Sequence, residues 1–220
     1  MEIAERLQLL KDGLPEKVKV LAVSKFKSES VIMEAYNAGQ RIFGENRVQE
    51  LVPKYENLPK DIEWHFIGHL QANKVKFIAP FIHTVQSVDS LKLAELLNKE
   101  AIKNSRKIRI LLQIHIAQEE QKHGFSFDEM EDLLKKGAFS PFENLDISGL
   151  MGMATLTDDQ TQIRKEFRRL NSFFQQIKND YFERKDSFNE LSIGMSDDYR
   201  IAVEEGSTMI RIGSRLFGTR

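Results

Sequence analysis

The chain has 220 residues, and 41% of them are hydrophobic, which is enough for one domain with a sizeable core. Its 32 basic and 33 acidic residues give a net charge of −1, which argues against a protein that binds nucleic acid by neutralising phosphates. It contains no cysteine, so disulfides, thiolate metal sites and a cysteine nucleophile are excluded.

No apolar run approaches the roughly 20 residues needed to cross a bilayer, so no membrane association is expected. The first residues, MEIAERLQLLKDG, predict a short amphipathic helix that carries acidic side chains, unlike a secretory signal. We therefore expect a cytoplasmic protein.

Short β-rich runs alternate with helical periods along the chain, which predicts parallel βα units. Strands are predicted at residues 18–23, 41–43, 63–67, 82–86, 108–116, 145–150, 190–193 and 209–212. Helices are predicted at residues 29–38, 48–55, 71–77, 90–103, 128–135, 159–178 and 197–204, and an extra N-terminal helix at 4–10 comes first. Eight strands predict an α/β fold, a closed (β/α)8 TIM barrel that forms a single domain over residues 1–220, because open sheets of the Rossmann type commonly have five or six strands. The polar stretch 118–124 offers the core nothing to bury and is predicted to be a mobile loop.

Polar and glycine-rich residues gather at the carboxyl ends of these predicted strands, where such barrels build their active sites. The segments are AVSK at 22–25, FGEN at 43–46, HFIGHLQANK at 65–74, GLMGM at 149–153, LSIGMSDD at 191–198 and RIGS at 211–214. This asymmetry predicts one functional site at one end of the barrel.

Lys25 follows an apolar strand, so its stem is expected to pack while its amine reaches the barrel mouth. Desolvation or nearby cations can deprotonate such a lysine, and a neutral amine attacks an aldehyde to form an imine. The alternative is a lysine that extends to solvent at a strand end, and position alone favours that alternative.

A phosphate site is predicted from the loops after the last two strands. Ser196 is expected to be the N-cap of the following helix, and Gly213 and Ser214 offer close backbone approach and a hydroxyl. Barrels frequently bind phosphate with the loops after strands seven and eight. An ordinary capped helix and an ordinary turn are the alternative for each segment alone.

Arg211 lies within the apolar strand MIRI and is expected to share the face of Met209. An arginine inside a barrel needs a partner, so it meets a ligand or a carboxylate such as that of Glu45. His65 and His69 have the spacing of a helical metal-ligand pair, but Gly68 makes a helix there doubtful, and the other histidines are scattered. No metal site is predicted.

Taken in order, AVSK, FGEN, WHFIG, LQANK, LSIGMSDD and the terminal GSTMIRIGSRLFG closely resemble the pyridoxal-phosphate homeostasis proteins over nearly the whole chain. The resemblance implies a barrel like the N-terminal domain of alanine racemase that holds pyridoxal 5′-phosphate as a Schiff base. It implies these cofactor-binding residues: Lys25 as the Schiff-base lysine, Asn46 beside the cofactor, Arg211 at the pyridine nitrogen, and Ser196, Gly213 and Ser214 at the phosphate. Ser214 departs from the threonine expected there, but keeps the hydroxyl.

The same resemblance implies a protein of vitamin B6 homeostasis that buffers or delivers the cofactor without strong turnover. Its partners would be pyridoxal phosphate itself and cofactor-dependent apoenzymes or B6 salvage enzymes. An arginine at the ring nitrogen weakens the electron sink, and a racemase needs a second base that the relative takes from a further domain. The alternatives are an amino-acid racemase and a cofactor-free aldolase using Lys25. No long exposed apolar stripe is evident, so we expect a monomer.

Overall fold

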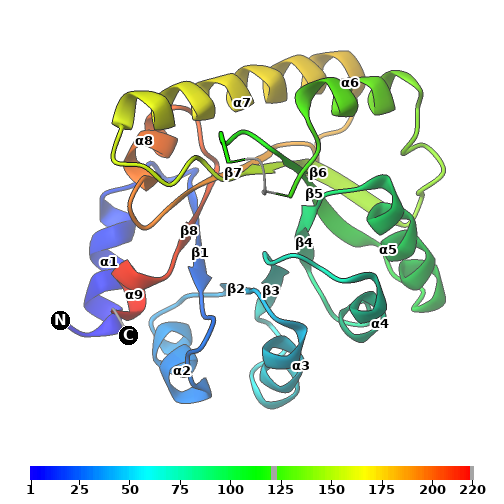
Figure 1. Cartoon of the computed structure of the whole chain (residues 1–220). Coiled ribbons are helices and arrows are strands. Elements are labelled where there is room, and N and C mark those ends of the chain that lie inside the picture. The colour runs from blue at the N-terminus through cyan, green and yellow to red at the C-terminus, as the bar shows by residue number, and fades with distance from the viewer. Residues whose placement is uncertain (120–122, 219–220) are drawn as a thin grey trace.

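Eight short strands rich in branched apolar residues close into a parallel barrel in the computed structural model, which describes residues 1–119 and 123–218 (Figure 1). The strands are β1 (Lys19–Val23), β2 (Ile42–Glu45), β3 (Glu63–Phe66), β4 (Thr84–Val88), β5 (Ile108–Ile114), β6 (Leu145–Gly152), β7 (Glu190–Met195) and β8 (Met209–Ile212). They neighbour each other in sequence order, and β8 pairs with β1 to close the ring. The predicted (β/α)8 barrel is confirmed.

Helices surround the barrel and cover its outer surface (Figure 1). They are α1 (Ile3–Asp12), α2 (Glu29–Asn37), α3 (Val48–Asn57), α4 (Val75–Ile78), α5 (Leu91–Lys103), α6 (Phe127–Lys135), α7 (Gln160–Tyr181), α8 (Tyr199–Glu204) and α9 (Ser214–Phe217), with a 3-10 turn, η1, at Ala72–Lys74. The predicted helix at 71–77 is thus a 3-10 turn followed by α4, and α9 was not predicted. Residues 120–122 of the predicted loop lie outside the described residues.

The outer layer of the core forms where helices pack on the strands. Apolar residues recur along one face of α7 at helical spacing, and Phe167, Leu170 and Ile177 on that face are fully buried. Within the described part of the chain, no helix is both long and apolar enough to cross a membrane.

The register between the first and last strands determines where the site forms. Lys19 lies opposite Met209, and Ala22 lies opposite Ile212, so the carboxyl ends of β1 and β8 are level with each other. On the other side of β1, Val23 lies opposite Gly44 of β2. The segments after β7, β8, β1 and β2 therefore meet at one side of the barrel mouth.

Candidate functional site

Lys25 lies in a turn directly after β1 and is exposed to solvent. The packed stem expected from the sequence is therefore not seen. No hydrogen bond or ion pair joins its amine to another described residue, whereas Lys27, two residues on, donates to the Gly218 carbonyl oxygen at 3.4 Å. Lys25 offers a free amine at the mouth of the barrel.

A buried polar cluster under this turn fixes the backbone that leads to Lys25. Ser24 Oγ donates to Glu45 Oε1 at 2.6 Å, and Lys54 Nζ donates both to the same oxygen at 2.6 Å and to the Ser24 carbonyl oxygen at 2.9 Å. All three side chains are buried, and burial raises the pKa of Glu45 against the opposing effect of these hydrogen bonds. Glu45 thus pairs with Lys54, and the suggested ion pair with Arg211 is wrong.

Phe26, the residue after Lys25, has a φ of 62°, which a bulky side chain rarely adopts. Its backbone N–H donates to Glu50 Oε2 at 2.8 Å, and the Arg47 guanidinium lies over its ring. Lys25 is therefore held between two anchored neighbours, Ser24 on one side and Phe26 on the other.

Asn46 follows β2 and lies beside the loop that follows β3. A Cβ at Gly68 would come within 2.3 Å of the Asn46 carbonyl oxygen, so only glycine allows the two segments to pass this closely. The Asn46 Oδ1 atom is buried and lacks a hydrogen-bond partner in the structure. Such an atom is costly unless a ligand satisfies it.

Arg211 lies inside the barrel and is only 4% exposed. Its Nη1 donates to the carbonyl oxygen and Oγ of Ser192 at 2.7 and 2.8 Å, and its Nη2 donates to the Gly152 carbonyl oxygen at 2.9 Å. The Nε–H and the second Nη2–H have no acceptor among the described residues. Burial lowers the pKa of Arg211 to about 10, against the opposing effect of Asp198, so the guanidinium stays charged at neutral pH.

A chain of buried hydrogen bonds continues from Arg211 into the barrel. Ser192 Oγ donates to Gln86 Oε1 at 2.7 Å, and Gln86 Nε2 bonds to His65 Nδ1 at 2.8 Å. Sequence reasoning missed Gln86 and Ser192 as supports of Arg211. The available signal was a polar side chain within a fully buried strand, as in TVQSV of β4.

The predicted phosphate residues lie together after β7 and β8. Ser196 Oγ accepts a hydrogen bond from the Gly213 backbone N–H at 3.3 Å, and Ser196 is buried whereas Ser214 is exposed. Ser196 is not a helix cap, however, because α8 begins at Tyr199 with Asp198 in the N-cap position. The reason is local: the Met195 N–H donates to Asp198 Oδ1 at 2.5 Å and forms a turn before the helix.

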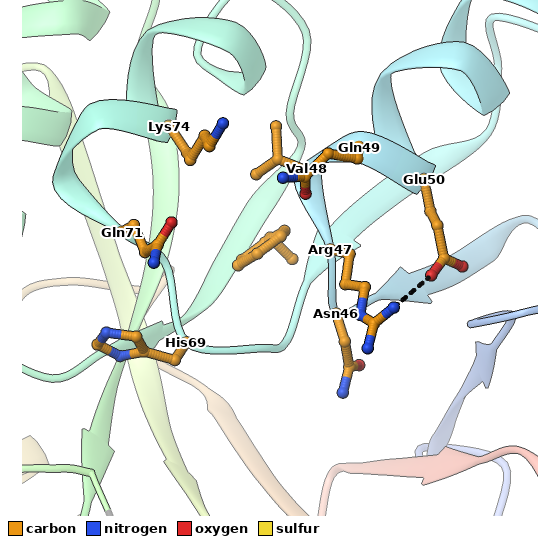
Figure 2. A pocket seen from close by; sticks show the side chains of 9 residues that line it. Asn46, Arg47, Val48, Gln49, Glu50, His69, Gln71 and Lys74 are labelled. Atoms are coloured by element: carbon orange, nitrogen blue, oxygen red, sulfur yellow. Dashed lines mark ion pairs between the residues drawn. The ribbon is translucent and has the colours of Figure 1, made fainter.

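A cavity of about 460 Å³ lies between the segments that follow β2 and β3 (Figure 2). Side chains from the start of α3 and from the segment after β3 face it, among them Arg47, His69 and Lys74. Of the predicted cofactor residues, Asn46 lines it. The cavity therefore neighbours the predicted site.

Four observations fit the cofactor that the sequence resemblance implies: a free amine at Lys25, an unpartnered oxygen on Asn46, spare N–H donors on Arg211, and hydroxyl groups on Ser196 and Ser214. The residues that carry these groups follow four adjacent strands of the barrel, β7, β8, β1 and β2, or lie at the ends of these strands. In pyridoxal phosphate the aldehyde bonds an amine, the ring nitrogen accepts from a hydrogen-bond donor, and the phosphate accepts from hydroxyl groups.

Comparison with known proteins shows the family to which the chain belongs. The family model for the alanine racemase N-terminal domain matches residues 1–220. A protein of Haemophilus influenzae named pyridoxal phosphate homeostasis protein is 41% identical over 92% of this chain and 85% of its own length. The Escherichia coli K12 protein of the same name is 37% identical over 94% of this chain and 87% of its own.

Solved structures show the same relationship. PipY of Synechococcus elongatus, solved without pyridoxal phosphate, superposes with a TM-score of 0.91 at 37% identity, covering 99% of this chain and 100% of PipY. PipY with pyridoxal phosphate bound superposes with a TM-score of 0.88. Alanine racemase of Clostridium difficile shares the fold at 16% identity, with a TM-score of 0.79 over 56% of its length.

Proposed function

Because this chain belongs to the alanine racemase N-terminal domain family, and within it to the pyridoxal phosphate homeostasis proteins, we propose that it binds pyridoxal 5′-phosphate at the barrel mouth. In this role it holds or delivers the cofactor for vitamin B6 homeostasis. The observation that carries the proposal is the free amine of Lys25 beside Asn46, Arg211 and the serines after β7 and β8.

Each residue then has a defined task. Lys25 supplies the amine that bonds the aldehyde, and Asn46 Oδ1 lies beside the cofactor. The spare N–H groups of Arg211 would donate to the ring nitrogen. Ser196, Gly213 and Ser214 would hold the phosphate, and the hydrogen bond from the Gly213 N–H to Ser196 Oγ links the two loops that carry them.

Pyridoxal phosphate supplies an aldehyde that bonds amines and a ring that withdraws electrons best when its nitrogen is protonated. Arg211 donates N–H groups and does not release a proton at neutral pH, because its pKa stays at about 10 even when buried. It therefore leaves the ring nitrogen neutral, which suits storage and transfer of the cofactor better than turnover. The exposed turn that carries Lys25 also suits exchange with cofactor-dependent apoenzymes or B6 salvage enzymes.

We further propose that the protein acts as a monomer in the cytoplasm. No strongly catalytic role is proposed. A racemase is the alternative enzyme, and it requires an acid or base on the substrate face opposite Lys25.

The test is the visible absorbance spectrum of the purified chain with pyridoxal phosphate, before and after borohydride, followed by mass spectrometry of the reduced protein. We expect a visible band in the native chain and in Lys27→Ala, a reduced adduct on Lys25, and neither in Lys25→Ala. An equal band in Lys25→Ala would exclude the assignment. Measurable interconversion of D- and L-alanine would replace the carrier with the racemase.

A further inference from the structure

The two histidines of the HFIGH segment separate in the structure. His65 points into the barrel, whereas His69, after β3, meets Asp89, after β4, and His123, between β5 and α6. We propose that His69, Asp89 and His123 form a binding site for a divalent transition-metal ion of the zinc type. Sequence analysis predicted no metal site, since these residues lie far apart along the chain.

The distances suit a metal ion. His69 Nδ1 lies 3.0 Å and His123 Nδ1 lies 3.6 Å from Asp89 Oδ2. One ligand atom from each of the three residues lies within 4.8 Å of the other two. Zinc binds nitrogen and oxygen ligands at about 2.1 Å, which at tetrahedral angles separates the ligands by roughly 3.4 Å. The two separations from Asp89 lie on either side of that value, and the two histidine nitrogens lie within 4.8 Å of each other, so side-chain rotations can bring the three atoms onto one ion.

The chemistry of the donors points in the same direction. Two imidazole nitrogens converge on one carboxylate oxygen, and the two rings are stacked with centroids 4.0 Å apart. A hydrogen bond joins His69 Nδ1 to Asp89 Oδ2, but at 3.6 Å His123 Nδ1 lies too far from that oxygen to form one. A cation between the three atoms would be bound by all three groups. Two histidines and one carboxylate are typical ligands of zinc and its neighbours in the first transition row.

The loops that carry these residues are attached to the barrel. Ser87 Oγ donates to the Gly68 carbonyl oxygen at 2.5 Å, next to His69 and close to Asp89 in the chain. Gln113 Nε2, from β5, donates to the His123 carbonyl oxygen at 2.8 Å. Asp89 is 11% exposed in its side chain, while the histidines are about half exposed at 47% and 58%. The site is thus anchored on one side and open to solvent on the other, which leaves a coordination position for a water or a small carboxylate.

A second cluster, Glu63, His65 and His83, has similar spacing but a different electrostatic environment. Burial lowers the pKa of His83 against the opposing effect of Glu63, and the nearby positive charges lower it further; these charges belong to Arg109, Lys19 and Arg106. The same positive charges would repel a metal cation from this second cluster. The second cluster therefore serves as the internal control.

The test uses the full chain without an affinity tag, treated with a chelator and then titrated with Zn²⁺ by calorimetry and with Co²⁺ by visible absorption. We expect one ion per chain in the native protein. His69→Gln and Asp89→Asn should each weaken binding at least about tenfold, and His83→Gln should leave it unchanged. Far-ultraviolet circular dichroism checks that each variant folds. If Asp89→Asn does not fold, His69→Gln, at a half-exposed position, still tests whether the site binds the metal.

The proposal is overturned by equal affinity in His69→Gln and the native chain, by a loss confined to His83→Gln, or by no cobalt absorption at millimolar Co²⁺. Because the proposed site uses β3, β4 and β5, the pyridoxal phosphate band should form in all three variants. The metal and the cofactor are thereby tested separately.

Discussion

The guanidinium of Arg211 donates to Ser192 Oγ at 2.8 Å, and this contact sets the direction of every hydrogen bond behind it. Arginine can only donate, so the Ser192 proton turns to Gln86 Oε1, and the Gln86 amide nitrogen donates to His65 Nδ1. The neutral His65 ring must then carry its proton on Nε2, a buried atom for which residues 1–119 and 123–218 offer no hydrogen-bond partner. A fixed polar axis therefore runs from the mouth of the barrel into its interior.

Replacing Gln86 with leucine should break this axis. His65 Nδ1 and Ser192 Oγ would each lose a buried partner, which should lower the free energy of unfolding by about 2 kcal/mol. Arg211 would lose the support behind Ser192, so the pyridoxal phosphate absorbance band should also shift. Urea denaturation and the visible spectrum measure the two effects. A stability loss with an unchanged spectrum would mean that Gln86 supports the core but does not position Arg211.

Acid should destabilise the barrel through His65. Burial is the main cause that holds the pKa of His65 well below the ordinary histidine value of 6.5, so the folded state keeps the ring neutral. Once the pH falls below 6.5, the unfolded chain binds this proton and the folded chain does not. Stability contributed by His65 is thus complete above that pH and is lost as the pH falls, by up to about 1.4 kcal/mol per pH unit.

His65→Gln should flatten this dependence, and His115→Gln serves as the matched control. Urea denaturation at several pH values between 4.5 and 7.5 measures the free energy of unfolding. If this free energy changed with pH equally in the native chain and in His65→Gln, other groups would cause the acid sensitivity.

Substitutions of Glu45 and Lys54 should have strongly non-additive effects on the free energy of unfolding. Glu45→Leu removes the carboxylate that lies 2.6 Å from the buried Lys54 ammonium and leaves it only Glu50, at 3.7 Å, so unfolding should become easier by up to about 3 kcal/mol. Glu45→Leu combined with Lys54→Met should cost far less than the sum of the single changes. Because Lys54 also holds the Ser24 carbonyl oxygen, both single variants should bind pyridoxal phosphate more weakly. Additive changes in stability would contradict the coupling.

Gly68→Ala should disturb the site through Asn46. The new Cβ would lie 2.3 Å from the Asn46 carbonyl oxygen, so one of the two loops must move. We expect weaker cofactor binding with the barrel retained, measured by titration of the absorbance band. Gly13→Ala, where the nearest atom lies at 3.5 Å, should bind normally. Normal binding by Gly68→Ala would show that Asn46 does not need its present position.

The alternation of strands and helices was sufficient to predict the barrel, since hydrophobic periodicity reports which faces are buried. It could not show how the polar interior is connected, because Gln86, Ser192 and Arg211 meet only after the ring closes. The N-cap assigned to Ser196 failed for a related reason: the Asp198 carboxylate captures the Met195 N–H and delays the helix. The role of Lys25 was predicted from motif resemblance, and its freedom from partners came from the structure.

The pairing of Lys19 with Met209 places the first strand beside the last, so the site can form only after both strands have been synthesised. Synthesis runs from the N-terminus onward, so Lys25 is made before Arg211 and Ser214. A nascent chain therefore has the proposed Schiff-base amine before it has the groups proposed to bind the ring nitrogen and the phosphate. If these residues bind the cofactor as proposed, stable capture requires β8 to pair with β1, so retention of pyridoxal phosphate would report that the barrel has closed.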